Sequence, residues 1–159
     1  MIYGFKLSAS RLMRAVPTGA VLIAFGLAPA SASEACSEIR KLVQAAPAGF
    51  SSVDQPPTFH DVGKPENCSI SKELSGSSAY ICFWEFDYRS PAATQGFETL
   101  NQSLIQCLGS DAQVKSDQPV NHPDFYDLKT YATDTATLSI SIKDKAALEK
   151  TFVFLRVGG

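Results

Sequence analysis

A run of alternating aromatic residues leads directly into a helical pattern and restricts how this 159-residue chain can fold. From Tyr80 to Arg89 the side chains alternate with a period of two, which predicts a β-strand. One face of this strand should be buried, because it carries only aromatic side chains and a thiol. That face consists of Tyr80, Cys82, Trp84, Phe86 and Tyr88. The other face begins apolar and ends with charged residues, so its far end should meet water.

Helix signals follow the strand at once. Ser90 is a favourable N-cap, and Pro91 suits the first helical position because its missing N–H would have no partner there. Gly109 is well placed for a left-handed C-cap. The apolar stripe between these ends is formed by Phe97, Leu100, Leu104, Cys107 and Leu108. We therefore expect the helix to lie back along the strand, with this stripe against the aromatic face.

The remaining elements are read in the same way. Residues 33–46 have a helical apolar stripe that ends at Pro47-Ala48-Gly49. Further strands are expected at 50–53, 68–74, 112–115, 125–132, 137–143 and 151–157. The last of these is apolar on both faces, which indicates a central strand or one covered on both sides. Together they predict an α+β two-layer sandwich, an antiparallel sheet of about six or seven strands with two helices on one face.

The sequence also contains a weak internal repeat in the order of its expected elements. Asp54-Gln55-Pro56 and Asp117-Gln118-Pro119 each follow an expected helix and a short strand, and each precedes further strands. Duplication of an α-β-β-β unit is one interpretation of this repeat. The other is that the matching tripeptides arose by coincidence.

Residues 1–32 have the pattern of a secretory signal peptide. A basic segment precedes an apolar core at 20–30, which at 11 residues is too short to span a bilayer. Ala30-Ser31-Ala32 matches a signal peptidase site, so we expect the mature chain to start at Ser33. Met13 is an alternative start. The residue usage of this segment is typical of bacteria, so we expect a periplasmic or secreted protein.

The mature chain, 33–159, has the length of a single domain. The signal segment contains three of the 14 Lys and Arg residues and no carboxylates, leaving 11 cations against 16 anions, a net charge of −5. This balance argues against nucleic acid and anionic membranes as partners. It is compatible with a basic protein partner. The oligomeric state is left open by these patterns.

All four cysteines lie in the mature chain, which in an oxidising compartment indicates two disulfides. We favour Cys68–Cys82 across a hairpin together with Cys36–Cys107 between two helices. Cys82–Cys107 with Cys36–Cys68 is the second possibility, and a third pairing stays open. A metal site is not expected, since no cysteines are spaced as CxxC and no histidine lies near one at ligand spacing.

No catalytic motif is present in the sequence. It has no nucleophile elbow, phosphate-binding loop, H-E-x-x-H or dinucleotide fingerprint. His60 with Asp61, and His122 with Asp124, are the candidate base and orienting pairs. A small hydrolase or metal-dependent enzyme using both histidines is therefore the alternative to a non-enzymatic protein, and no cofactor is expected.

Two long loops combine proline, acidic and aromatic residues, which suits recognition because prolines limit the entropy lost on binding. Covering the ends of the core is their plainer role. Candidate binding residues from the loops are Phe59, His60, Asp61, His122, Asp124 and Tyr126. Glu85 and Asp87 add an acidic stripe on the central strand, which could meet a basic partner or simply be solvated.

These features predict an exported, non-enzymatic binding domain. Its expected partner is another envelope or secreted protein, as for an inhibitor or immunity protein of an envelope-acting enzyme. A carrier of small apolar ligands is a further alternative, and it would need a cavity behind Trp84.

Overall fold

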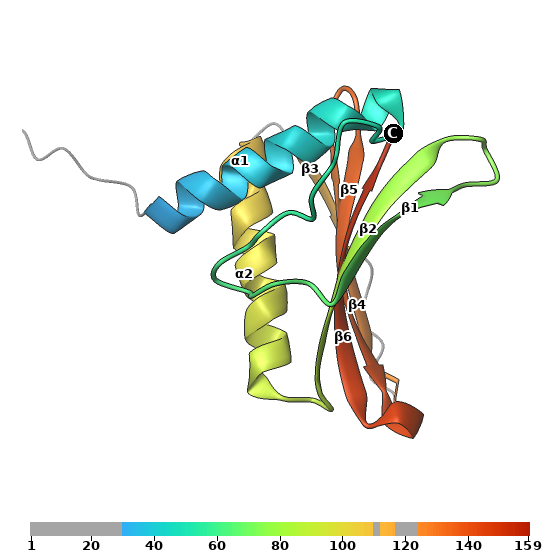
Figure 1. Ribbon diagram of the computed structural model, residues 1–159. Helices are drawn as coiled ribbons and strands as arrows, with labels where there is room; N and C mark the ends of the chain where they lie inside the picture. Colours follow the sequence, from blue (N-terminus) through green and yellow to red (C-terminus); the bar gives the residue numbers. More distant parts are fainter. Residues whose placement is uncertain (1–29, 110–111, 117–123) are drawn as a thin grey trace, which may run out of the picture.

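The computed structural model describes residues 30–109, 112–116 and 124–159. In this part of the chain two α-helices lie on one side of an antiparallel six-stranded sheet (Figure 1). The helices are α1 (Ala30–Ala45) and α2 (Pro91–Leu108), and the short 3-10 helices are η1 (Ala46–Ala48) and η2 (Ala146–Leu148). The strands are β1 (Asn67–Lys72), β2 (Ser78–Asp87), β3 (Gln113–Ser116), β4 (Tyr126–Ala132), β5 (Thr137–Lys145) and β6 (Lys150–Gly158). The predicted α+β class, antiparallel with two helices, is confirmed.

The predicted strand and helix both form, although Phe86 and Tyr88 of the aromatic face are only half-buried and Tyr88 follows the end of β2. Cys82 and Trp84 are buried beneath the helices, and Tyr80 is 6% exposed. The Ser90 side chain accepts a hydrogen bond from the backbone N–H of Ala93, which caps α2 at its N-terminus. At the other end Gly109 ends the helix with a φ of 77° and a ψ of −176°, so it does not form the predicted left-handed C-cap but adopts an extended conformation that is nearly specific to glycine. Local signals therefore define both ends of α2.

The sheet order is β1-β2-β6-β5-β4-β3, so the last strand lies between β2 and β5 near the centre. Val153, Leu155 and Val157 of β6 face the helices and are buried. The alternate residues Phe152 and Phe154 point to the opposite face, where they are partly exposed. The prediction of a central strand is confirmed. No element that the structure describes covers its second face.

One predicted strand is wrong. Residues 50–53 form a turn, because Gly49 and Phe50 both adopt positive φ angles and reverse the chain after η1. Phe50 is 1% exposed and packs on Tyr80 with ring centroids 5.6 Å apart. Its apolar character therefore reflects burial at a helix end. The α-β-β-β duplication is not formed either, since α1 is followed by two strands and α2 by four in the described residues.

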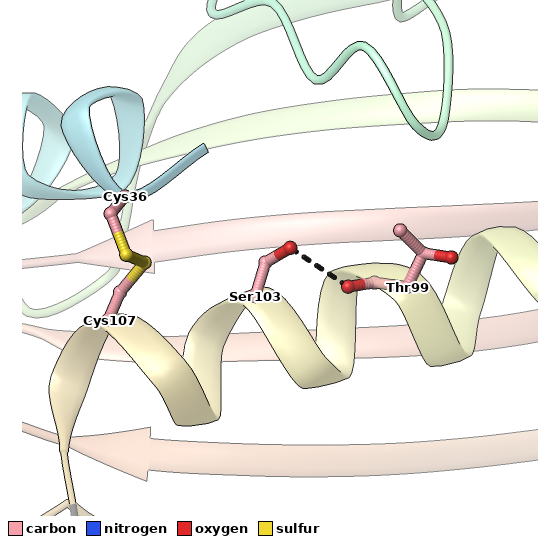
Figure 2. The surroundings of a disulfide bond; sticks show 4 residues. All are labelled: Cys36, Thr99, Ser103 and Cys107. Carbon is pink, nitrogen blue, oxygen red and sulfur yellow. Dashed lines mark hydrogen bonds between the residues drawn. A yellow bond between two sulfur atoms is a disulfide. The ribbon is translucent and has the colours of Figure 1, made fainter. Parts of the chain in front are cut away.

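Two disulfides connect the elements, in the favoured pairing. Cys36–Cys107 joins α1 to the C-terminal end of α2 (Figure 2), and Cys68–Cys82 joins facing residues of β1 and β2. Within α2, the Ser103 hydroxyl donates a hydrogen bond to the backbone carbonyl of Thr99 (Figure 2). Intramolecular disulfides of this kind suggest an oxidising compartment.

A buried carboxylate holds the turn between β2 and α2 in place. Asp144 is 3% exposed and accepts hydrogen bonds from Arg89 Nε at 2.8 Å and Thr151 Oγ1 at 2.6 Å. The hydrogen bond to Asp144 raises the pKa of Arg89. Arg89 has a positive φ of 52°, and its backbone N–H is bonded to Thr151 Oγ1. These contacts set the direction in which α2 leaves the sheet.

Removing the two disulfides separately should have unequal effects on stability. Cys36–Cys107 closes a sequence separation of 71 and Cys68–Cys82 one of 14. In the chain-entropy model, C36A/C107A should lower the free energy of unfolding by about 4 kcal/mol and C68A/C82A by about 3 kcal/mol. Urea unfolding of the oxidised variants measures both losses. A larger loss for C68A/C82A would contradict this ordering.

Candidate interaction surfaces

A groove lies between α1 and the loop that follows η1. Its volume is about 650 Å³, within the range of roughly 300–1,000 Å³ typical of ligand sites. Leu42 and Ala45 of α1 and Pro57 of the loop line it and are themselves buried. The groove therefore combines an apolar floor with a polar rim. Its further lining residues include Glu34, Glu38, Lys41, Val53, Asp54, Pro56 and His60.

Both walls of the groove are fixed to the core. The loop wall is anchored by Phe59, whose ring meets the Trp84 ring edge-on at 5.8 Å. Trp84 Nε1 also donates a hydrogen bond to the Gly63 carbonyl at 2.9 Å. The helical wall is anchored by the buried Ile39 and by the Cys36–Cys107 disulfide to α2. A groove held in this way exists before any partner arrives.

The rim of the groove is acidic. Glu34, Glu38 and Asp54 are carboxylates, and Lys41 is the cation among the described lining residues. Lys41 Nζ is already paired with Glu38 Oε1 at 2.6 Å. Glu34 Oε1 lies 3.2 Å from His60 Nε2, and both side chains are more than half exposed. Three carboxylates against one lysine give the rim an excess of negative charge that could attract a basic group.

A second surface is the uncovered face of the sheet, which we call the open face. Strand register places Phe83, Phe152 and Phe154 side by side on it, with ring centroids 6.0–6.2 Å apart. These rings line a shallow hollow of about 340 Å³ together with Lys143, Lys145 and Leu148. Leu148 is 62% exposed. The open face therefore presents a contiguous aromatic patch.

Charges flank this patch on both sides. On the β2 side, Glu85 and Asp87 lie 3.3 Å and 3.5 Å from Lys150 Nζ. The hydrogen bond to Glu85, followed by that to Asp87, raises the pKa of Lys150. On the β5 side, Lys143 and Lys145 line the hollow. The predicted acidic stripe is thus partly neutralised by a neighbouring lysine that the sequence pattern did not single out.

The predicted binding residues are divided between the two sides of the molecule. His60 lies on the groove rim, and the exposed Asp61 lies in the turn beside it. Glu85, Asp87 and Tyr126 belong to the strand rows of the open face, where Lys143 Nζ lies 5.1 Å from the Tyr126 ring centroid. Phe59 is 2% exposed, so its side chain supports the loop and offers no surface to a partner.

The second loop is described only from Asp124 onward. Asp124 Oδ1 accepts a hydrogen bond from the backbone N–H of Ala146, and Oδ2 lies 3.5 Å from Lys145 Nζ. These bonds tie Asp124 to the start of η2. His122, like most of the signal segment and Met13, lies outside the described residues. The enzyme alternative, which needs His60 and His122 together, is therefore untested.

Sequence reasoning missed the main features of both surfaces. The acidic groove was missed because Glu34 and Glu38 belong to an ordinary amphipathic helix, and only folding brings Asp54 beside them. The aromatic patch did leave a signal, since the last strand is apolar on both faces while two helices can cover one. Following that signal would have singled out Phe152 and Phe154.

No protein-family model and no curated protein matches the chain. Among residues 30–109, 112–116 and 124–159, no three His, Cys, Asp or Glu side chains are grouped to hold a metal ion. None of the helices in this described part has the length and apolar character needed to cross a membrane.

Replacing Phe59 separates a structural role from a binding role. We expect Phe59→Ala to lower the free energy of unfolding by about 3–5 kcal/mol, because a large buried ring is lost. The Trp84 fluorescence should shift to longer wavelength as water reaches the indole. The matched control is the exposed neighbouring residue, His60. We expect His60→Ala to change the free energy of unfolding by less than about 0.5 kcal/mol. Equal stability of the two variants would show that Phe59 does not anchor the loop.

Proposed function

We propose that this protein is an exported, non-enzymatic binding domain that holds a basic segment of another protein in the groove beside α1. The signal-like segment at 1–32 supports export, and the two disulfides are consistent with an oxidising compartment. An inhibitor or immunity protein acting on an envelope enzyme is the role that fits best. The absence of a catalytic motif in the sequence favours binding over catalysis.

The observation that carries this proposal is the combination of an apolar floor with an acidic rim in one groove. Buried Leu42, Ala45 and Pro57 offer apolar contact, while Glu34 and Asp54 offer charge. A Lys or Arg side chain suits such a site, since its aliphatic stem can lie on apolar atoms while its charged end reaches a carboxylate. The partner's segment is therefore expected to be basic and extended.

Rigid walls make such a groove effective. The disulfide between α1 and α2 and the Phe59–Trp84 contact hold both walls, so little ordering of the domain is needed when a partner binds. Lower ordering cost leaves more of the contact energy as affinity. Protein inhibitors commonly rely on this kind of preorganisation.

The test uses the oxidised, exported protein as bait in envelope and culture-supernatant extracts. The captured protein is identified by mass spectrometry, purified, and its affinity is measured by calorimetry. The variant E34Q/D54N removes two rim carboxylates and should weaken binding about 3- to 10-fold, with a smaller effect at high salt. The control D134N/E149Q makes the same charge change at exposed positions away from the groove. Equal affinity for both variants would exclude the groove as the site.

A further inference from the structure

We propose that the open face of the sheet packs against the open face of a second copy of this chain, about a two-fold axis that runs along β6. The occupant is another copy, and the product is a symmetric dimer with four layers, helix-sheet-sheet-helix. This surface lies on the opposite side of the sheet from the helices, so the dimer leaves the groove beside α1 open. The proposal is independent of what the groove binds.

The composition of β6 requires a cover that no described element provides. Strands that are apolar on both faces are typical of sheets buried on both sides. The helices cover Val153, Leu155 and Val157, while Phe152 and Phe154 remain partly exposed on the other face. A contiguous apolar patch of this kind on a soluble domain marks an interaction site.

The size of the open face suits a stable dimer. Six strands at about 4.8 Å spacing, each about seven residues long, give a face of roughly 25 Å by 23 Å. Protruding side chains make its accessible area larger than this projection of about 600 Å², so it reaches the order of the 800 Å² per partner that standard interfaces bury. Two sheets packed face to face also form the common sandwich arrangement, with a core about 10 Å thick.

Charge identifies the occupant as a second copy. In one row across the sheet, Glu85 of β2 and Lys143 of β5 flank Phe152 of β6. In the next row, Asp87 of β2 and Lys145 of β5 flank Lys150. In these two rows the face is therefore acidic on β2 and basic on β5. On β6 itself, Phe152 and Phe154 lie between Lys150 and Arg156, and Arg156 is paired with Glu73.

A two-fold axis along β6 turns this pattern into a complementary one. The rotation brings β2 of one copy over β5 of the other, so that Glu85 faces Lys143 and Asp87 faces Lys145, twice per dimer. Phe152 and Phe154 then meet their own copies at the centre. An axis perpendicular to the strands would place β2 over β2, with carboxylate against carboxylate. The charges therefore select one symmetry.

Lys150 lies close to the axis and keeps its present partners. It is already within 3.3 Å of Glu85 and 3.5 Å of Asp87 in the same chain. In the dimer the two Lys150 ammonium groups are surrounded by four carboxylates, two from each copy. Their mutual repulsion is thereby offset. Lys143, whose Nζ lies over the Tyr126 ring, and Lys145, which already lies 3.5 Å from the exposed Asp124, then meet the facing acids as additional partners.

The first measurement is the mass of the oxidised, exported protein by sedimentation equilibrium. We expect twice the monomer mass, and a melting temperature that rises with protein concentration because association stabilises the folded state. Phe154→Ser should give a monomer, since the centre of the patch is lost. A wild-type protein that stays monomeric from micromolar to millimolar concentration overturns the proposal.

Charge reversal tests the symmetry. E85K/D87K makes both flanks of the open face cationic, and K143E/K145E makes both anionic. Each variant alone should be monomeric because like charges then face each other. An equimolar mixture should recover a species of twice the monomer mass, and native mass spectrometry should identify it as one copy of each. Recovery on mixing also shows that both variants are folded.

The matched control is E98K/D134K, which reverses an exposed carboxylate of α2 and one of the turn between β4 and β5, both off the open face, and it should remain dimeric. Dimers that persist in both charge variants, with no preference for the mixed species, would overturn the proposed interface. A monomeric wild type that still binds a partner through the groove would leave the proposed function standing while overturning the dimer.

Discussion

Packing of α2 on the inner face of the sheet is the contact on which the rest of the structure depends. The apolar stripe of α2 covers β2, β6 and β5, and Phe97, Leu100 and Leu104 are almost completely buried there. Strands that are distant in sequence are joined under this one helix, since β2 precedes it and β5 and β6 follow. Each fully buried side chain of this size contributes roughly 1.5–3 kcal/mol.

The first helix depends on α2. It packs mainly on α2 and is tied to it by Cys36–Cys107, while its C-terminal end reaches the sheet through Phe50 and Tyr80. The groove is therefore built as a second step on an existing platform. The loop wall reaches the same core through Phe59 and Trp84. A change in the core beneath Trp84 would thus be felt at the groove rim.

Because both helices pack on one face of the sheet, the opposite face has no cover among the described elements. A single layer of helices can cover one face of a sheet, and the central strand here is apolar on both. Aromatic rings therefore lie at a surface, between an acidic strand and a basic one. The same arrangement that makes a stable inner core creates an outer surface suited to association, and the two interaction surfaces lie on opposite sides of one sheet.

The local sequence by itself determined which segments are strands and helices in most of the described chain, and where α2 begins and ends. It favoured the observed cysteine pairing but left two others open, because Cys36 and Cys107 are 71 residues apart. The strands, the helices and the ends of α2 depend on residues close in sequence, so periodicity, Ser90 and Gly109 carry enough information. The sequence pattern gave a wrong prediction at residues 50–53, where the apolar Phe50 suggested a strand but is buried at the end of a helix. Only the tertiary structure decided the order of the strands, the placement of Glu34 and Asp54 around one groove, and the exposure of Phe152 and Phe154. Those depend on which faces pack together, and packing is decided by contacts between residues far apart in the chain.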